Sequence, residues 1–463
     1  MLRPFLIVTF PSDEIAKEVC SRCVLVKSVG RLMGIGGTVR ECKSAVSGYV
    51  GGCRGCDLKE DDSWKINFET FGNKTTKEEQ VTIMNEFIPE VDVGGKVRMK
   101  GADVEYNLVM EYEVTVEGEP RYPRTDNEGK VVEGNKGKGL RAVYFSKLVS
   151  PGGRSLSDKY KLTNRPYLGP TSMDNEISIL MCLSGLVTPS SYVCDPFVGT
   201  GSILFTAAVM GANTVGMDID VRVLKGRKKG VDVFSNFDKF SLPRPDIFRM
   251  DFSMHSRVLG GRGGLGGTYD AIITDPPYGI RAGARRIDGS GTTGGRRDDH
   301  IVKTKVYEVS DVMSDLLSMA AENLRMGGRL VYLIPTLRDF DEKVDLPGHE
   351  CLKLEWCCNQ PLQLQLGRRM VVMTKVKEFD KGKAAEWRSK CWPMGEESAN
   401  KVERLREQMG KEAERKRRAL EEGGGGEGNK TSKKKKRKIC GVERNTVEVK
   451  KFQDDDQDDS EDK

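Results

Sequence analysis

From about Arg165 to Lys377 the sequence alternates short β-rich runs with helical segments, and this alternation limits the possible folds more than any other feature. The β-rich runs are 192–195, 214–218, 247–250, 270–274 and 329–334, and two of the helical segments are 202–210 and 310–325. Alternation of this kind is typical of a parallel, doubly wound sheet covered by helices. We therefore expect residues 161–380 to form an α/β domain.

The first 160 residues have a different pattern and predict a separate α+β region. Short β-like runs occur at 5–10, 65–68, 96–99 and 141–145. Between 12 and about 27, the apolar residues Ile15, Val19, Cys23 and Val26 recur at spacings of four and three, which places them on one face of a helix. A polar, glycine-rich stretch from 117 to 139 reads as a loop.

After about Asp380 the composition predicts that the folded core ends. Residues 381–463 hold a charged segment, four consecutive glycines, the basic run KKKKRK from Lys433 to Lys438, and an acidic end. Such a segment lacks the apolar content to bury a core, so we expect a mostly disordered tail. The net charge of the whole chain, +6 over 463 residues, is too small to identify a nucleic-acid-binding protein by itself.

Composition excludes two classes of protein. The longest apolar runs are far shorter than the ~18–20 residues of a membrane-spanning helix, so we expect no membrane contact. The apolar stretch before Pro11 is too short for a secretory signal. We read the 12 cysteines as reduced thiols of an intracellular protein.

A glycine turn between two β-rich runs predicts a nucleoside-binding site. In YVCDPFVGTGSILFTAAVMGANTVGMDID (192–220), Gly199 and Gly201 follow a strand and open a helix. Glycines allow the backbone to approach a ligand closely. The next strand ends at Asp218, 17 residues past Gly201, where a carboxylate can accept hydrogen bonds from both ribose hydroxyls. This unit by itself serves NAD, FAD or S-adenosylmethionine equally well.

Two details favour S-adenosylmethionine over a dinucleotide. The dinucleotide pattern GxGxxG needs a third glycine where this chain has Leu204. Asp195 precedes the turn, where a carboxylate repels a pyrophosphate but pairs with the cationic methionine end of S-adenosylmethionine. Asp251, after the third strand, is placed to accept a hydrogen bond from the adenine amine.

The segment YDAIITDPPYGI supplies groups that suit transfer of a methyl group to a base amine. The expected strand 270–274 delivers Asp275, Pro276, Pro277 and Tyr278 to the carboxyl edge of the sheet, where open α/β sheets bind ligands. The Asp275 carboxylate and the Pro276 carbonyl can both accept hydrogen bonds from an exocyclic NH2 group, which directs its lone pair toward a methyl donor. Tyr278 offers a ring for a base taken out of its stack. Together with the preceding motifs, this segment predicts an amino-methyltransferase site.

The same motifs resemble those of one known family. NRPYLGPTSMDNEI (164–177), DPFVGTGS, GMDID, AIITDPPYGIR, AAENLRMGGRLVYLIP (320–335) and GRRMVVMTKVKEF (367–379) resemble the catalytic subunit of the eukaryotic tRNA guanosine-10 N2-methyltransferase. The resemblance covers roughly residues 1–380. DPPY alone fits many base methyltransferases, whereas the TSMD element and the RRxxxMxKV ending narrow the resemblance to this family.

The resemblance implies a fold, an activity and partners. It implies a ferredoxin-like and THUMP region in 1–160 that docks tRNA, followed by a Rossmann-like class I methyltransferase domain in 161–380. The implied activity is monomethylation of N2 of guanine 10 in tRNA, with S-adenosylmethionine as cofactor. The implied partner is a small zinc-binding activator protein, and the implied location is the cytoplasm. The KKKKRK run from Lys433 to Lys438 also resembles a nuclear import signal.

Site residues follow from the resemblance by motif. Thr171, Ser172 and Met173 would border the methionine end of the cofactor. Asp195, Phe197, Gly199 and Gly201 would shape that pocket, Asp218 and Asp251 would hold ribose and adenine, and Asp275 through Tyr278 would receive the guanine. The family has an upstream stretch that completes its first ferredoxin-like unit, whereas this chain starts close to a later strand, PFLIVTF. On this resemblance we expect either a truncated N-terminus or a reduced first unit.

We expect no metal site in this chain. The four residues of the CxxC…CxxC pattern, Cys20, Cys23, Cys53 and Cys56, are separated by a central gap of 29 residues, longer than the ~15–20 of zinc ribbons. The three histidines lie far apart, and His255 reads as a solvated loop residue. Arg285, Arg286, Arg296 and Arg297 lie on an insert that follows the DPPY motif, where they serve either as contacts to tRNA phosphates or only as solvated side chains.

Two other functions remain open at this point. DPPY chemistry also fits an adenine-N6 methyltransferase that acts on DNA or RNA. A THUMP-like N-terminal region favours tRNA, and no separate DNA-recognition domain is visible in the sequence. A non-catalytic RNA-binding scaffold is the second alternative, and the complete cofactor and DPPY motifs argue against it.

Overall fold

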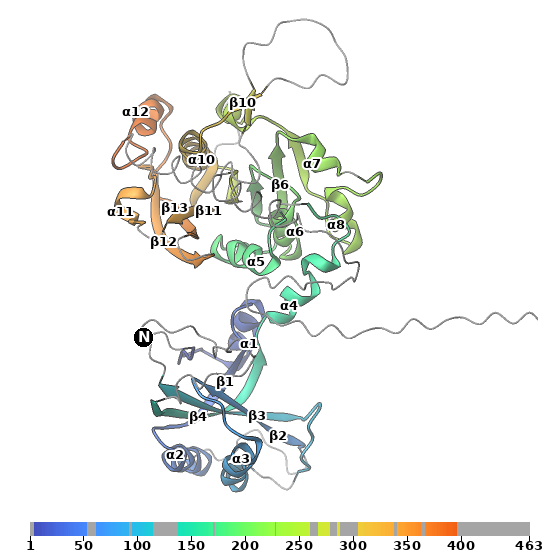
Figure 1. The fold of residues 1–463 in the computed structure, drawn as a ribbon, viewed down its shortest axis with the longest axis vertical. Coiled ribbons are helices and arrows are strands. Elements are labelled where there is room, and N and C mark those ends of the chain that lie inside the picture. Colours follow the sequence, from blue (N-terminus) through green and yellow to red (C-terminus); the bar gives the residue numbers. More distant parts are fainter. Residues whose placement is uncertain are drawn as a thin grey trace, which may run out of the picture. The chain divides into compact units, whose positions relative to one another are not determined.

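The computed structural model describes residues 4–52, 62–91, 95–113, 138–169, 172–226, 228–259, 267–277, 285–287, 304–337, 340–362 and 366–395. These residues contain a four-stranded N-terminal sheet, a seven-stranded sheet and a two-stranded sheet (Figure 1). Within this part of the chain, no helix is both long enough and apolar enough to cross a membrane.

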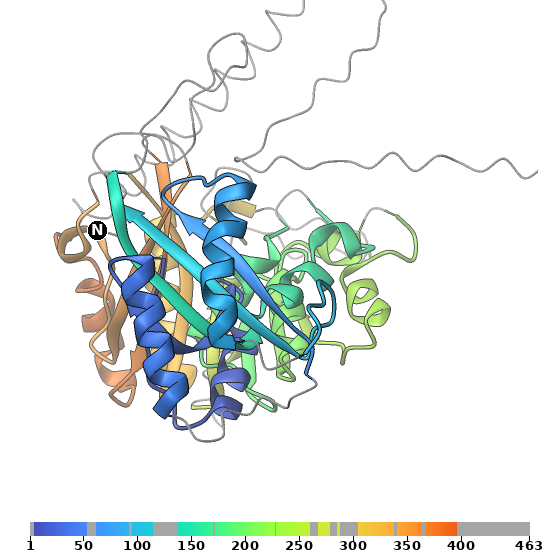
Figure 2. The same ribbon diagram turned by 90° about the horizontal axis from the view of Figure 1, so that it is seen from below.

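The N-terminal region is an α+β unit, as the sequence predicts. Its elements are α1 (Asp13–Arg22), β1 (Ser28–Gly36), α2 (Val39–Gly52), β2 (Trp64–Phe71), α3 (Lys77–Val91), β3 (Val104–Glu113) and β4 (Lys138–Pro151). The strand order is β1-β4-β3-β2, with β2 and β3 parallel and the other pairs antiparallel. Helices α2 and α3 lie side by side on one face of this sheet (Figures 1 and 2).

Aromatic side chains form the centre of this N-terminal core. Phe87 of α3 stacks on Phe145 of β4 with ring centres 4.9 Å apart, and Tyr106 of β3 lies 5.4 Å from the same ring. All three side chains are fully buried. Their packing fixes α3 against the sheet, since aromatic residues supply much of the buried area of a core.

Three sequence predictions in this region are wrong. Residues 5–10 form no strand, and the run 96–99 contributes only a bridge between Val97 and Trp64. Helix α1 ends at Arg22 rather than near residue 27. Its buried residues are Ala16 and Cys20, whereas Ile15 and Val19 are 42% and 44% exposed. The face of α1 that packs on β1 and β4 therefore carries small residues, whereas the larger apolar residues lie outside this contact.

The second region, which contains the large sheet, follows α4 (Arg154–Lys159) and η1 (Leu162–Asn164). Its first half consists of α5 (Asn175–Ser184), β5 (Tyr192–Asp195), α6 (Ser202–Val209), β6 (Asn213–Asp218), α7 (Val221–Lys225), α8 (Val233–Lys239), β7 (Asp246–Arg249), η2 (Phe252–Met254) and α9 (His255–Val258). Its second half consists of β8 (Tyr269–Thr274), β9 (Arg285–Ile287), β10 (Thr304–Val306), α10 (Val309–Asn323), β11 (Leu324–Leu337), α11 (Glu342–Asp345), β12 (Leu352–Pro361), β13 (Leu366–Lys375), η3 (Lys381–Lys383) and α12 (Ala384–Ser389).

The strand order of the large sheet is β12-β13-β11-β8-β5-β6-β7. Strands β11, β8, β5, β6 and β7 are parallel, as predicted, while β13 runs antiparallel to both of its neighbours. The chain moves outward from β5 through β6 to β7 and then returns to β8 on the other side of β5. The strand order therefore reverses between β5 and β8, which is where open α/β sheets bind their ligands.

The folded core extends beyond the predicted boundary near Asp380. Helix α12 follows that residue, and Trp387, Cys391 and Trp392 are buried in the same cluster as α10 and β11. Trp387 Nε1 also donates a hydrogen bond to Glu350. The composition after Asp380 is dominated by charged residues, so it does not reveal that these three apolar side chains are enough to pack against the core. The remainder of the predicted tail, from 396 onward, lies outside the described residues.

Candidate active site

Three carboxylates meet where the strand order reverses. Asp195 ends β5, Asp218 ends β6, and Asp275 directly follows β8. The strands are parallel neighbours, so their carboxyl ends lie at one edge of the sheet. Asp195 is 1% exposed, and its carboxyl is repelled by those of Asp218 and Asp275. The structure thus brings together residues that the sequence predicted to share one site.

Asp195 is held by two hydrogen-bond donors. Thr274 Oγ1 donates to Asp195 Oδ1 over 2.7 Å, and the Phe197 amide donates to the same oxygen over 3.0 Å. Burial raises the pKa of Asp195 to about 7; the two donors lower it, and the neighbouring carboxylates raise it further. The net result is a carboxyl that titrates close to neutral pH.

The two glycines of the turn have backbone conformations that other residues rarely adopt. Gly199 and Gly201 have φ values of 52° and 76°, in the region that favours glycine. A Cβ on Gly201 would also lie 2.6 Å from Val233 Cγ2. The Gly199 amide donates to Asp218 Oδ2 over 2.8 Å, so the turn and the end of β6 are fixed relative to each other.

Asp218 and Asp251 are both oriented by backbone amides. Asp218 also accepts a hydrogen bond from the Asp220 amide at 2.8 Å, and burial raises its pKa. Asp251 caps η2 and accepts from the amide and hydroxyl of Ser253, at 2.9 and 2.8 Å. Neither side chain needs to rearrange in order to present a fixed acceptor. Both positions stay predictions for ribose and adenine contacts.

An aromatic group lies beside Asp251. The Phe197 and Phe252 rings are 4.6 Å apart, and His255 stacks on Phe252 at 5.3 Å. His255 is 5% exposed and its Nδ1 lies 3.2 Å from the Phe252 carbonyl oxygen, so the prediction of a solvated loop residue is wrong. Burial lowers the pKa of His255 and favours the neutral ring. Phe197 and its neighbours thus offer an apolar wall next to the acceptors.

The charge pattern of the site fits a cationic nucleoside. Neither Asp195 nor Asp218 forms an ion pair with any residue that the structure describes, although both are largely buried. Buried carboxylates without a cation are unfavourable. A ligand that carries an ammonium and a sulfonium at one end and ribose hydroxyls at the other would relieve this repulsion and use the acceptors. S-adenosylmethionine has these groups.

The residues predicted before α5 have different surroundings. Ser172 Oγ accepts a hydrogen bond from the Gly169 amide and lies 2.9 Å from Thr200 Oγ1, which joins this segment to the glycine turn. Met173 is 7% exposed and packs in the apolar cluster formed by α5, α6 and the sheet. Thr171 lies outside the described residues.

Part of the predicted base-binding motif is described. Pro276 is buried and Pro277 is half-buried, directly after Asp275. Tyr278 lies outside the described residues, as do Arg296, Arg297 and the side chain of Arg285. Arg286 of β9 forms an ion pair with Asp311 of α10, with Nη1 and Oδ2 3.6 Å apart. This arginine therefore contacts α10.

Sequence reasoning missed a buried arginine near the glycine turn. Arg165 is 5% exposed and donates to Asn175 Oδ1 at 2.9 Å and to Ser202 Oγ at 3.3 Å. Its guanidinium lies 4.3 Å from the centre of the Phe205 ring, and burial lowers its pKa to about 10. Arg165 ties the starts of α5 and α6 together. The only available signal was its place in the NRPY motif.

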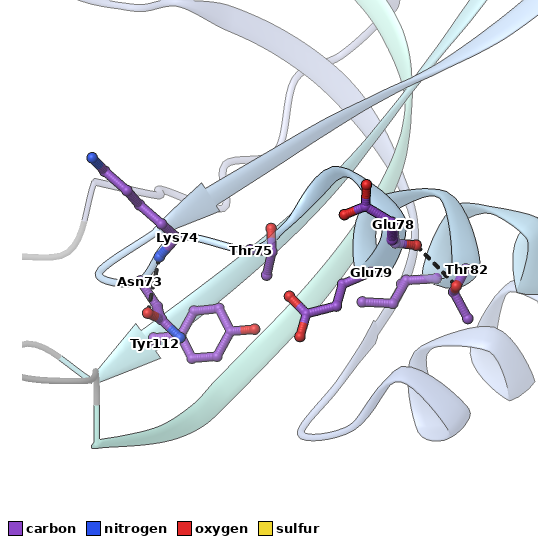
Figure 3. Close-up of a pocket in the computed structure, with 8 residues that line it drawn as sticks. Asn73, Lys74, Thr75, Glu78, Glu79, Thr82 and Tyr112 are labelled. Carbon is purple, nitrogen blue, oxygen red and sulfur yellow. Dashed lines mark hydrogen bonds between the residues drawn. The ribbon is translucent and has the colours of Figure 1, made fainter.

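A pocket of about 440 Å³ lies elsewhere, at the start of α3 in the N-terminal region (Figure 3). Its lining includes Lys74, Glu78, Glu79 and Tyr112. Glu79 accepts a hydrogen bond from the Thr76 amide at 2.9 Å and thereby caps the helix. The two carboxylates, Glu78 and Glu79, repel phosphate, and Lys74 balances only one of them.

The cysteine pattern falls only partly within the structure. Cys20 is buried in α1 and Cys23 follows that helix, while Cys53 and Cys56 lie outside the described residues. Among the residues with described positions, no group of three or more His, Cys, Asp or Glu side chains is arranged to hold a metal ion.

Two family models match separate parts of the chain. Residues 2–135 match the model of the Tmrp11 THUMP N-terminal domain, and residues 163–234 match that of the RMKL-like methyltransferase domain. Among solved structures, TrmN from Thermus thermophilus is 16% identical, with a TM-score of 0.36 over 76% of this chain and 82% of that chain.

Curated relatives named tRNA (guanine(10)-N(2))-methyltransferase TRMT11 match most of the chain. The protein from Dictyostelium discoideum is 35% identical over 395 residues, 81% of this chain and 73% of the relative. The Gallus gallus protein is 33% identical over 81% of this chain and 80% of its own length, and the Homo sapiens protein is 32% identical over 81% of each. With this identity and coverage, the chain belongs to the TRMT11 family of tRNA (guanine(10)-N(2))-methyltransferases.

Proposed function

We propose that this protein transfers a methyl group from S-adenosylmethionine to N2 of guanosine 10 in tRNA. The observation that carries the proposal is the meeting of Asp195, Asp218 and Asp275 at the point where the strand order reverses. The first two suit a cationic nucleoside, and the third suits an exocyclic amine. The names of the relatives support guanosine 10 as the acceptor and tRNA as the substrate.

The proposed chemistry depends on acceptors rather than on a strong base. The guanine amine is a weak nucleophile because its lone pair is delocalised into the ring. The Asp275 carboxylate and the Pro276 carbonyl accept hydrogen bonds from its two N–H groups. These bonds localise the lone pair on nitrogen and hold the nitrogen in place. The Asp275 carboxylate takes up the proton that the amine loses after transfer. Proline cannot donate a competing amide hydrogen bond at this position.

The cofactor residues act by orientation. S-adenosylmethionine supplies a methyl group on a sulfonium, which makes that carbon electrophilic. Asp195 attracts the ammonium group at the same end, Asp218 accepts from the ribose hydroxyls, and Asp251 accepts from the adenine amine. Because amides of the glycine turn, of Asp220 and of Ser253 already fix Asp218 and Asp251, little reorganisation is needed on binding.

The decisive experiment follows a labelled methyl group. The full chain, with and without the proposed activator, is incubated with labelled S-adenosylmethionine and unmodified tRNA, and the labelled nucleoside is identified and mapped. N2-methylguanosine at position 10 is the expected product. Label on adenine N6, in RNA or in DNA, would overturn the substrate. Cofactor binding without transfer to any nucleic acid would favour a non-catalytic RNA-binding protein.

We also propose that the N-terminal region docks tRNA and that a small zinc-binding activator protein joins the catalytic chain. The match of residues 2–135 to a THUMP model supports the first part. An edge of the large sheet supports the second: within the described part of the chain β7 has one strand neighbour, and Phe248 on it is 56% exposed. Co-purification of the two proteins, lost on Phe248→Asp and kept on Asp246→Asn at the same strand, is the expected result.

The proposed location is the cytoplasm. The basic run from Lys433 to Lys438 lies outside the described residues and makes the nucleus the alternative. Imaging of the tagged full chain with this run intact, and with its lysines replaced by glutamine, separates the two. Cytoplasmic signal in both is expected.

A further inference from the structure

One buried hydroxyl connects the two halves of the candidate active site. Thr274 is the last residue of β8 and directly precedes Asp275, while Asp195 ends the neighbouring strand β5. Thr274 Oγ1 donates to Asp195 Oδ1 over 2.7 Å, and the two residues are 0% and 1% exposed. The strand that delivers the DPPY motif is therefore bonded to the carboxylate that faces the methionine end of the proposed cofactor.

A hydroxyl at this position needs its acceptor. A fully buried strand position favours valine or isoleucine, and a buried hydroxyl is unfavourable unless it forms a hydrogen bond. Among the described side chains, Asp195 is the acceptor for the Thr274 hydroxyl. The hydrogen bond to Asp195 thus offsets the cost of burying the Thr274 hydroxyl, and this bond lies inside the candidate site.

The surroundings of Asp195 make this donor important. The groups that interact electrostatically with Asp195 are Asp218 at the end of β6, Asp275 after β8, Cys182 on α5 and Cys194 on its own strand. None of them is a cation. The donors that stabilise its charge are the Thr274 hydroxyl and the Phe197 amide, and both bind Oδ1. Oδ2 accepts no hydrogen bond from the described residues, so it is available for a ligand.

We propose that Thr274 is a positioning residue that keeps the Asp195 carboxylate ionised and leaves Oδ2 for the ammonium group of the cofactor. This inference rests on the proposed function, because it assigns that group to Asp195. Thr274 acts through Asp195 and touches neither the methyl group nor the base. It also links cofactor binding to the position of β8, and hence to Asp275.

The inference has a pH signature. Burial and repulsion already raise the pKa of Asp195 to about 7, and loss of one of its two donors raises this pKa further. At neutral pH a larger fraction of Asp195 is then protonated and does not attract an ammonium group. At pH 9 the Asp195 carboxyl is more fully ionised both in the unmodified chain and in a variant without the Thr274 hydroxyl. The difference in cofactor affinity between the two proteins therefore becomes smaller.

The test measures binding of S-adenosylhomocysteine, which keeps the ammonium group but has no sulfonium, to the full chain by calorimetry from pH 6 to pH 9. Thr274→Val is expected to raise the Kd at pH 7 by about tenfold or more, as for loss of a hydrogen bond to a charged group. The loss of affinity is expected to be smaller at pH 9. Thr274→Ser restores the hydroxyl and is expected to bind within about threefold of the unmodified chain. Thr214→Val, at another buried threonine of the same sheet, is the matched control.

Three results would overturn the inference. The first is unchanged affinity of Thr274→Val at every pH. The second is an equal, pH-independent loss in Thr274→Val and Thr274→Ser, which would indicate packing alone. The third is the absence of binding by the unmodified chain at any pH, in which case the proposed function itself fails. Thermal melting of each variant identifies any change that comes from unfolding.

Discussion

At the scale of single residues, the candidate site is unfavourable for the free protein. Asp195 is repelled by both Asp218 and Asp275, and burial raises the pKa of Asp195 and of Asp218. No cation among the described residues pairs with Asp195 or Asp218. Sites of this kind are found where a ligand completes the charge balance. Because Asp218 and Asp275 each repel Asp195, removing either of them is expected to have an effect of its own.

Replacing Asp275 by Ala is expected to lower the rate of methyl transfer by roughly 10²–10⁴-fold, the range for loss of a positioned acid–base group. The cofactor Kd is expected to stay the same or to tighten slightly, since Asp275 repels Asp195. Transfer is measured with labelled methyl donor and tRNA, and cofactor binding by calorimetry. Asp246→Asn, an exposed carboxylate on β7, serves as the control. Turnover of Asp275→Ala within tenfold of the unmodified chain would refute the mechanism.

A second prediction concerns the pH dependence of stability. His349 is 8% exposed, burial lowers its pKa to about 4, and its Nδ1 accepts a hydrogen bond from the Cys351 amide at 3.1 Å. Protonation of Nδ1 would break that bond. An unfolded histidine takes up a proton near pH 6.5, so the folded state loses stability as the pH falls from about 6.5 toward 4.

For His349, this loss between pH 7 and pH 5 is about 2 kcal/mol. His349→Gln removes the titrating group, so its unfolding free energy is expected to approach or exceed that of the unmodified chain as the pH falls. Urea denaturation at pH 7, 6 and 5 measures the two curves. A difference between the two proteins that stays constant with pH would contradict the prediction.

At the scale of elements, the sequence predicts what depends on neighbouring residues along the chain. The strand expected at 192–195 is β5, and the helix expected at 202–210 is α6 within one residue. Periodicity misplaced the buried face of α1, because the pattern was read from large apolar side chains and passed over the small ones. Small residues such as Ala16 and Cys20 occupy that interface.

Strand direction and contacts between strands were harder to predict. β12 and β13 are antiparallel because the connection from Pro361 to Leu366 is too short for a crossover. In the site, Asp195, Asp218 and Asp275 were expected from their motifs. Thr274 was not, because its role depends on β5 and β8 being neighbours, and residues far apart in the sequence make that contact.

Helix α12 provides the prediction at this scale. Trp387 is 3% exposed and packs with α10 and β11, beyond the boundary expected near Asp380. Trp387→Ala is expected to lower the free energy of unfolding by about 3–5 kcal/mol, the cost of truncating a buried aromatic side chain. Trp356→Ala on the edge strand β12, where the side chain is 37% exposed, is expected to cost clearly less. Equal costs in urea denaturation would show that α12 is not part of the core.

At the scale of the whole molecule, two separate cores carry two proposed tasks. The residues of the N-terminal core come from the sequence range 33–145, and those of the clusters around the large sheet come from residue 160 onward. They share no residue. The three carboxylates Asp195, Asp218 and Asp275 lie at the ends of strands of the large sheet. A ligand bound there is therefore linked thermodynamically to the unfolding of that sheet and not directly to the N-terminal one.

This separation predicts how the chain melts. Cofactor at 100 times its Kd is expected to stabilise the large-sheet transition by about 2.7 kcal/mol and to leave the N-terminal transition in place. Phe87→Ala removes a stacked ring from the N-terminal core and is expected to lower only that transition, by about 3–5 kcal/mol, with the cofactor Kd unchanged. Val81→Ala, 51% exposed on the same helix, is the control. Scanning calorimetry of the full chain with and without cofactor measures both transitions. A single unfolding transition whose temperature shifts both on cofactor binding and in Phe87→Ala would show instead that the two cores unfold as one unit.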